Sequence, residues 1–155
     1  MLDKYEQLAL AIEIAVKAHK GQFDRSGKPY ILHPLHLMNE LMFDVQLAIV
    51  AVLHDVVEDT KDTVDEITIE DLKKNFSPRV IAALILLTHG DEPYEVYIEG
   101  ICSNYDAIRV KRKDLEHNSN ITRLKGIGPK DQARIVKYHK AFVRLTEAKR
   151  SFERK

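Results

Sequence analysis

Cysteine is almost absent from this chain, and neither sign of charge is in excess. Cys102 is the only cysteine among 155 residues, which excludes an internal disulfide and a four-cysteine structural zinc site. Lysine plus arginine number 24, as do aspartate plus glutamate, so the formal net charge is zero. A balanced charge gives no bulk attraction to nucleic acid or to an anionic membrane. An anionic ligand would therefore need a local cluster of basic side chains.

The amino-terminal stretch has the pattern of neither a signal peptide nor a membrane span. It reads MLDKYEQLALAIEIAV, which mixes both charges with apolar residues and is typical of an amphipathic helix. The single cysteine fits a reducing compartment, so we expect a cytoplasmic protein with no membrane partner. The chain also has no internal repeat, low-complexity tract or linker, and residues 1–155 are expected to form one domain.

Helical periodicity recurs along the whole chain, and strand-like alternation is rare. The breaks between periodic segments fall at Gly, Pro, Asn and Ser, the residues that commonly end helices. The sequence therefore predicts an all-α fold, a single bundle of about eight helices. The expected helices are residues 3–20, 34–43, 45–59, 68–75, 78–88, 93–103, 105–123 and 130–150.

Chemistry-bearing residues first gather in AVLHDVVEDT, residues 51–60. On a continuous helix, His54, Asp55, Glu58 and Asp59 would share an arc of about 140°, opposite the apolar side. An imidazole beside a carboxylate suits a metal ion, and two carboxylates one turn later could handle the protons of a water molecule. The alternative is a solvated acidic helix end, since more acidic residues follow. A metal site would need further ligands from elsewhere.

One source of further ligands is the loop GQFDRSGKPYILH, which combines glycine, proline, aromatics and both charges just before a helix. It ends in His33, followed by Pro34 at the first helical position, where proline is well tolerated. By itself His33 is better explained as an ordinary helix-start residue than as a ligand, and His36, one turn further on, is a competing candidate.

A second source is AIRVKRKDLEHNSNITRL. On a helix, Lys111, Asp114 and Asn118 fall within an arc of about 60°, interleaved with apolar residues. A buried carboxylate is costly unless it is paired or binds a metal. Asp114 therefore either forms an ion pair with Lys111 or shares a metal with the segment around His54. His117, beside Asp114 and Asn118, could add a hydrogen bond behind such ligands.

Three blocks together carry a resemblance. AHKGQ…RSGKPYILHPL, VLHDVVEDT and VKRKDLEHN occur in the order and approximate spacing of the HD-domain hydrolases of the RelA/SpoT type, which remove pyrophosphate from the alarmone (p)ppGpp. The resemblance runs from about residue 5 to about residue 145, and its specificity lies in the joint occurrence of the blocks. Without a synthetase portion, the chain resembles a small, stand-alone hydrolase of this group.

The resemblance implies a role for each matching residue. It makes His33, His54, Asp55 and Asp114 the ligands of a metal ion, for which the family's usual choice is manganese. Two imidazoles and two carboxylates also suit Mn, Fe or a similar ion on chemical grounds. Glu58 and Asp59 are implied to orient and deprotonate the attacking water, and no covalent intermediate is needed.

The resemblance also implies contacts to a small nucleotide substrate. Arg25 and Lys111 can pair with phosphates, and Asn118 can hydrogen-bond the sugar or the phosphates. Ser26 matches a family position in the same loop. Tyr138 can pack on the sugar or the base, although an aromatic residue in an amphipathic helix is more often part of the core.

Two departures from the family pattern bear on the substrate and leave the metal ligands intact. Asp24 stands where alarmone hydrolases commonly place a second basic residue, and GDEPYEVYIEG replaces a segment rich in lysine and arginine. The same machinery could therefore act on another nucleotide or on a pyrophosphorylated tRNA 3′ end. A different class of function is nucleic-acid binding, because LKGIGPKDQARIV partly resembles a helix-hairpin-helix. Its small residue comes one position late, and a turn before a helix starting at Pro129 explains it more simply.

Overall fold

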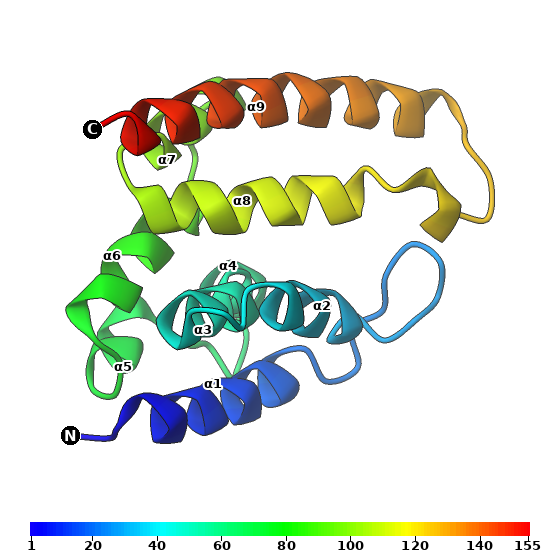
Figure 1. The fold of residues 1–155 in the computed structure, drawn as a ribbon. Coiled ribbons are helices and arrows are strands. Elements are labelled where there is room, and N and C mark those ends of the chain that lie inside the picture. The colour runs from blue at the N-terminus through cyan, green and yellow to red at the C-terminus, as the bar shows by residue number, and fades with distance from the viewer.

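The computed structural model describes residues 1–155 and is entirely helical (Figure 1). The only β-type pairing is an isolated bridge between Phe23 and Pro29, so the all-α prediction is confirmed. Nine α-helices and one 3-10 helix follow one another: α1 (Lys4–Ala18), α2 (Leu32–Glu40), α3 (Val45–Leu53), α4 (Val56–Thr60), α5 (Ile69–Lys73), α6 (Pro78–Leu87), α7 (Tyr94–Ile101), α8 (Tyr105–Asn118), η1 (Ile121–Arg123) and α9 (Pro129–Glu153).

The expected helix over residues 45–59 is broken in the structure. Helix α3 ends at Leu53 and α4 begins at Val56, so His54 and Asp55 lie between the two helices. The His54 side chain competes with the backbone for a carbonyl oxygen of the last turn of α3, because its Nδ1 lies 2.7 Å from the Ala51 carbonyl oxygen. The prediction that the acidic residues and His54 share one arc of a continuous helix is therefore wrong, although the break keeps them together.

The helix predicted over residues 105–123 is also shorter in the structure, where α8 ends at Asn118. Asn120 caps the following 3-10 turn, since its side chain accepts from the Thr122 amide at 3.1 Å. Asparagine side chains that bond nearby backbone amides compete with helix continuation, which explains the early end.

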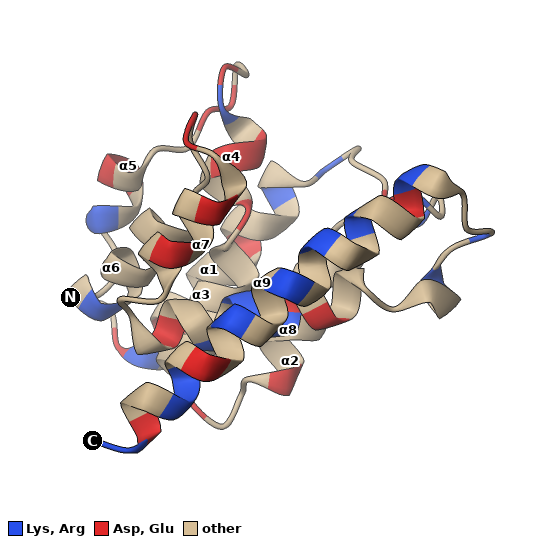
Figure 2. Cartoon of the chain, turned by 90° about the horizontal axis from the view of Figure 1, so that it is seen from above, with Lys and Arg blue, Asp and Glu red and all other residues tan.

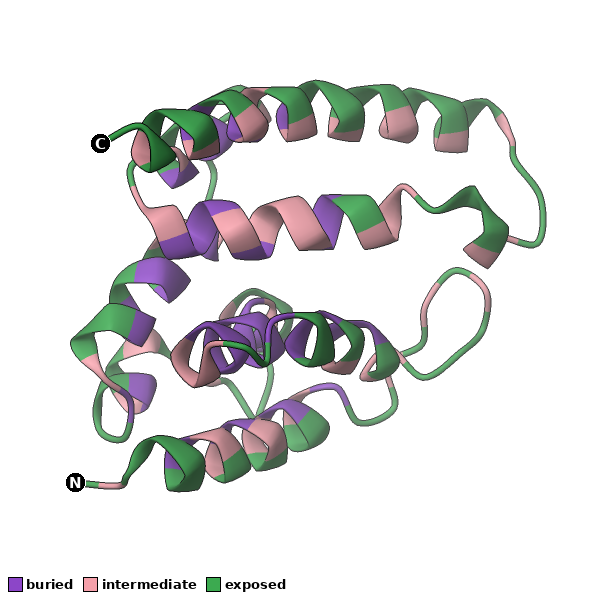
Figure 3. Ribbon diagram, viewed as in Figure 1, coloured by how far each residue is buried: buried purple, intermediate pink, exposed green.

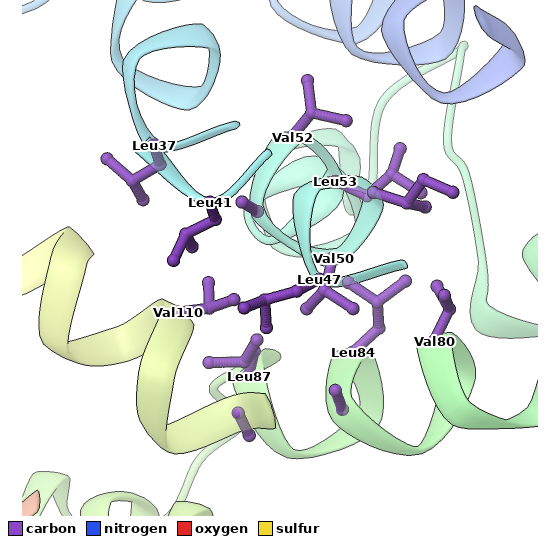
Figure 4. Close-up of a cluster of buried hydrophobic side chains, with 14 of the residues drawn as sticks. Leu37, Leu41, Leu47, Val50, Val52, Leu53, Val80, Leu84, Leu87 and Val110 are labelled. Carbon is purple, nitrogen blue, oxygen red and sulfur yellow. The ribbon is translucent and has the colours of Figure 1, made fainter. Parts of the chain in front are cut away.

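Helix α3 forms the centre of the core. Its residues from Leu47 to Leu53 are all buried, and Figure 3 shows this part of the chain almost wholly purple. A helix that is apolar on all sides needs neighbours on all sides, and α1, α2, α6 and α8 supply them. Figure 4 shows the resulting cluster: Leu37 of α2 and Leu41 directly after it, Leu47, Val50, Val52 and Leu53 of α3, Val80, Leu84 and Leu87 of α6, and Val110 of α8. Each fully buried leucine contributes about 2 kcal/mol of transfer free energy.

Helix α9 packs along α8 and α7 on the far side of the bundle from α1 (Figure 1). Lysine and arginine recur along its outer surface in Figure 2, and its buried residues are Ala141, Leu145 and Ala148. Its amino-terminal half faces the loop between α1 and α2. No helix in this chain combines the length and the apolar character needed to cross a bilayer.

Candidate active site

The four predicted metal ligands come from three parts of the chain and meet in its interior. His33 lies in the first turn of α2, His54 and Asp55 at the α3–α4 break, and Asp114 on α8. His33 Nε2 is 2.8 Å from Asp114 Oδ1, and His54 Nε2 is 3.0 Å from Asp55 Oδ2 and 3.5 Å from Asp114 Oδ1. One donor atom each from His33, His54 and Asp55 lie within 4.8 Å of one another. Only 2% of His33, 3% of His54 and 4% of Asp114 is exposed, so these groups are held away from water.

The donor set fits a divalent transition metal, and one orphaned atom supports this. His54 Nε2 is buried and has no hydrogen-bond partner, since the Asp55 oxygen lies close to it but outside hydrogen-bond geometry. Burial acts to lower the pKa of His54, yet the Asp55 and Asp114 carboxylates outweigh it and raise the pKa well above its ordinary value. The carboxylates thus favour a cation at this point, either a proton or a metal ion. Two imidazoles with two carboxylates suit Mn, Fe or a similar ion.

Tyr30 orients Asp55, a contact that the sequence did not predict. The Tyr30 hydroxyl donates to Asp55 Oδ2, the same oxygen that faces His54. Burial and the Asp55 charge raise the pKa of Tyr30 far above its ordinary value, so the hydroxyl keeps its proton. Burial opposes ionisation of Asp55, but His54 and the Tyr30 hydrogen bond lower its pKa to about 2. Asp55 is therefore a carboxylate across the physiological range.

Asp114 forms the predicted ion pair with Lys111 and also lies beside His33 and His54. Lys111 Nζ donates to Oδ2 at 2.8 Å, and Asn118 Nδ2 donates to Oδ1 at 2.9 Å. The same carboxylate faces His33 and His54. Burial acts to raise the pKa of Asp114, but Lys111 and the two histidines hold it well below its ordinary value. The ion pair with Lys111 thus keeps Asp114 charged where it faces His33 and His54.

Glu58 and Asp59 lie on α4 (Val56–Thr60), one turn after His54 and Asp55. Glu58 Oε2 accepts from the His89 amide at 3.2 Å, and Asp59 Oδ2 accepts from Gln22 Nε2 at 2.9 Å. Burial raises the pKa of both carboxyl groups, and for Asp59 the nearby Asp55 charge adds to the effect. Both groups are thereby better proton acceptors than ordinary surface carboxylates.

Two adjoining cavities, each of about 300 Å³, are lined by the four acidic residues of the site and by the predicted substrate residues, whereas His33 and His54 line neither. The inner cavity contains the carboxylates and three predicted substrate residues: it is lined by Tyr30, Asp55, Glu58, Asp59, His89, Tyr94, Tyr97, Lys111, Asp114, Asn118, Lys137 and Tyr138. The outer cavity contains the two predicted residues of the loop, and is lined by Gln22, Phe23, Asp24, Arg25, Ser26, Tyr30, Asn118, Asn120, Arg123, Leu124, Arg134 and Tyr138. Tyr30, Asn118 and Tyr138 border both cavities, so a ligand of nucleotide size could span them.

The segments that form this site match a known protein family in part. A family model described as "HD domain" matches residues 11–88, which is half of the chain. The chain belongs to the HD domain family. The matched range includes five of the predicted site residues described above: His33, His54, Asp55, Glu58 and Asp59. Asp114 lies outside the matched range, on α8.

Curated relatives share this HD domain within much longer chains. The guanosine-3′,5′-bis(diphosphate) 3′-pyrophosphohydrolase of Borreliella burgdorferi is 38% identical over 87 residues, covering 53% of this chain and 12% of that protein. The protein of the same name from Aquifex aeolicus is 41% identical over 78 residues, covering 48% of this chain and 10% of its own. The bifunctional (p)ppGpp synthase/hydrolase SpoT of Escherichia coli is 29% identical over 150 residues, covering 87% of this chain and 20% of its own. The chain thus spans a tenth to a fifth of the length of these relatives.

Asp24, the first departure from the family pattern, stabilises the loop between α1 and α2 by hydrogen bonds within it. Asp24 Oδ1 accepts from the Ser26 amide at 2.9 Å, from the Ser26 hydroxyl at 2.7 Å and from the Lys28 amide at 2.9 Å. Gly27 supplies a left-handed φ of 83° within this turn. Asp24 Oδ2 also lies 3.6 Å from Arg123 Nη2. Basic groups in the outer cavity therefore come from Arg25, Arg123 and Arg134.

The second departure, GDEPYEVYIEG, presents tyrosines rather than acidic groups to the HD site. Tyr94 and Tyr97 line the inner cavity, whereas Glu95 and Glu99 are exposed. Lys137 Nζ sits 4.2 Å from the centre of the Tyr94 ring and borders the same cavity, so a basic group is present there. Lys137, Gln22 and Tyr30 had no role predicted from the sequence. Gln22 and Tyr30 lie within the blocks that carry the resemblance, which was the available signal.

Proposed function

We propose that residues 1–155 form one metal-dependent phosphohydrolase domain that removes the 3′-pyrophosphate from (p)ppGpp or a close analogue. The observation that carries the proposal is the buried, unpartnered His54 Nε2, which faces the carboxylates of Asp55 and Asp114 beside a cavity. The names of the curated relatives support the substrate, and the adjoining cavities match the two parts of a phosphorylated nucleotide.

In this proposal His33, His54, Asp55 and Asp114 hold the metal ion, with manganese as the expected ion. A bound divalent ion would lower the pKa of a water molecule and stabilise negative charge on the phosphoryl group. Glu58 and Asp59 take the proton from the attacking water, because burial has made both carboxyl groups more basic. The water oxygen bonds to phosphorus, the bond from phosphorus to the 3′ oxygen breaks, and the released hydroxyl recovers a proton.

The substrate would lie across both cavities. Lys111 and Lys137 are placed to pair with the reacting phosphates in the inner cavity, and Arg25 with the remaining phosphates in the outer one. Asn118 and Tyr138 border both cavities and suit the sugar, while Ser26 lies in the outer cavity with the aromatic Phe23. Phosphates are therefore expected at both ends of the ligand.

One observation keeps a second substrate in view. Tyr94 and Tyr97 occupy the wall of the inner cavity, where the alarmone hydrolases place basic residues. The same metal site and the same carboxylates could serve another nucleotide or a pyrophosphorylated tRNA 3′ end. A helix-hairpin-helix is less well supported, because the Gly128 amide donates to Asp131 at 2.9 Å and is not free for a phosphate.

The test is a hydrolysis assay on protein stripped of metal and then supplied with Mn²⁺. The substrates are ppGpp, a panel of ordinary nucleotides and a tRNA carrying a 3′ pyrophosphate, with products separated by ion-exchange chromatography. We expect Mn²⁺-dependent release of GDP and pyrophosphate from ppGpp. Asp55→Ala should abolish it, and Asp65→Ala, which removes an exposed carboxylate, should not. Turnover of another substrate alone would overturn the alarmone assignment, and no Mn²⁺-dependent turnover of any substrate would overturn the hydrolase.

A further inference from the structure

His33 and His54, the two histidines that face the proposed metal site, have different hydrogen-bond partners at Nδ1. Both His33 and His54 direct Nε2 toward Asp114. Behind His54, Nδ1 lies 2.7 Å from the Ala51 carbonyl oxygen, which can only accept a hydrogen bond. His54 Nδ1 therefore carries a proton. Behind His33, Nδ1 lies 2.6 Å from another imidazole nitrogen, Nδ1 of His117.

The contact between the two Nδ1 atoms restricts where protons can lie. Two imidazole nitrogens at hydrogen-bond distance share a single proton, because two N–H groups would repel and two lone pairs would leave both unsatisfied. If His117 donates, a neutral His33 carries its own proton on Nε2, the atom that faces Asp114, and cannot bind a metal there. If His33 donates, its Nε2 lone pair faces the Asp114 carboxylate oxygen at 2.8 Å, an arrangement that requires a cation bound beside both atoms. Only the second arrangement is compatible with a metal ligand.

We infer that His117 is a positioning residue that accepts the His33 Nδ1–H and so holds His33 in the form whose Nε2 can bind the metal. This inference rests on the metal site of the proposed function. His117 accepts a hydrogen bond from His33 Nδ1, as the Ala51 carbonyl accepts one from His54 Nδ1. Partners of this kind orient the imidazole ring and raise its basicity as a metal ligand.

The position of His117 is itself fixed by its neighbours. Its ring lies edge to edge with that of His33, with centroids 4.9 Å apart and planes at 10°, and stacks on His36, with centroids 4.1 Å apart and planes at 19°. Its carbonyl oxygen accepts from Arg123 Nη1 at 2.8 Å. His117 lines an open surface cavity with His36 and Asn120, so its remaining N–H can donate to solvent. The ring is thus clamped with Nδ1 directed at His33.

Two variants separate the acceptor from the ring. His117→Phe keeps an aromatic ring between His33 and His36 but has no acceptor, whereas His117→Asn loses the ring and keeps an oxygen on Cγ, where Nδ1 is attached. Mn²⁺ affinity is measured by competition with a chelating dye. We expect about 10- to 100-fold weaker binding for His117→Phe and recovery of most of that loss in His117→Asn. His139→Leu, which removes an exposed imidazole, serves as the matched control and should bind as the wild type does.

A spectroscopic readout tests the proton positions directly. Protein labelled with ¹⁵N is loaded with diamagnetic Zn²⁺, and the ring nitrogens are identified by long-range proton–nitrogen correlation. We expect the proton on Nδ1 of His33 and on Nε2 of His117. A proton on Nδ1 of His117, or undiminished Mn²⁺ binding by His117→Phe, would overturn this inference. Failure of the wild type to bind Mn²⁺ at all would instead overturn the proposed function.

Discussion

His33 and Asp114 are 81 positions apart in the chain, yet His33 Nε2 lies 2.8 Å from Asp114 Oδ1. The contact joins the first turn of α2 to the last turn of α8, and therefore joins the matched HD region to a helix beyond it. Both groups are buried, so the contact depends on the packing of α8 against α2 and α3. The proposed metal site is consequently a property of the folded bundle and not of any one motif.

Metal binding should stabilise the fold. At Mn²⁺ concentrations about 100 times the dissociation constant, binding adds about 2.7 kcal/mol to the free energy of unfolding. For a chain of this size that raises Tm by about 5–10 °C. His54→Ala should lose the increase, and His139→Leu should keep it, both measured by thermal unfolding with and without Mn²⁺. An equal rise in the His54 variant would contradict a metal site at this residue.

Glu58→Gln should remove a proton acceptor while leaving the metal ligands in place. We expect kcat to fall about 100-fold or more, with Mn²⁺ affinity unchanged. Burial raises the pKa of Glu58 above 4.5, so the wild-type rate should fall as pH drops through that raised pKa, and this acidic limb should change in the variant. The exposed Glu66→Gln is the control. A full rate in Glu58→Gln would assign the proton to another group.

Gln22→Leu should remove a hydrogen bond to Asp59 and thereby change the pKa of the Asp59 carboxyl group. Gln22 Nε2 donates to Asp59 Oδ2, and its own Oε1 lies 2.8 Å from His19 Nδ1. The hydrogen bond from Gln22 lowers the pKa of Asp59 against burial, so its loss should raise that pKa further.

The expected result for Gln22→Leu is a kcat about 10-fold lower, corresponding to a lost charged hydrogen bond of about 1.4 kcal/mol. The acidic limb of the rate profile should move to higher pH, and Mn²⁺ affinity should stay as in the wild type. Gln132→Leu, on the exposed side of α9, supplies the comparison. An unchanged pH profile would argue against Gln22 acting through Asp59.

Asp106→Asn should destabilise the bundle in a pH-dependent way. Asp106 accepts from Arg79 Nε at 2.6 Å and from Arg109 Nη2 at 2.5 Å, and Arg79 also bonds Asp44 at the start of α3. Burial acts to raise the pKa of Asp106, but the two arginines lower it below 3.8. A carboxylate with a lowered pKa stabilises the fold above its unfolded pKa and loses this effect as pH falls through the folded value.

We therefore expect Asp106→Asn to cost about 2 kcal/mol at neutral pH and progressively less below about pH 4. Urea unfolding at several pH values measures the difference. Asp91→Asn, in an exposed loop, should show no comparable loss at any pH. A cost that does not change with pH would mean that the charge of Asp106 contributes little.

Much of the site was predictable because its parts are local. Block VLHDVVEDT keeps His54, Asp55, Glu58 and Asp59 close whatever the exact helix boundaries are, so the wrong prediction of one continuous helix did little harm. Helical periodicity alone also predicted the all-α fold. The early end of α8 was harder to predict, since the Asn120 side chain decides it by bonding the Thr122 amide. The roles of the site residues stay predictions until the assays are done.

Apolar periodicity and side-chain chemistry belong to short segments, so the sequence predicted the helical class of the fold and the groups available for chemistry, but not every helix boundary. The tertiary structure alone decided which of these groups meet. It placed Asp114 beside His33 and His54, left His54 Nε2 without a partner, and set the His117 ring behind His33. These contacts join residues far apart in the chain, and they form only when the helices pack together and exclude water. In such an interior an unpaired lone pair or charge is costly, so each needs a specific partner.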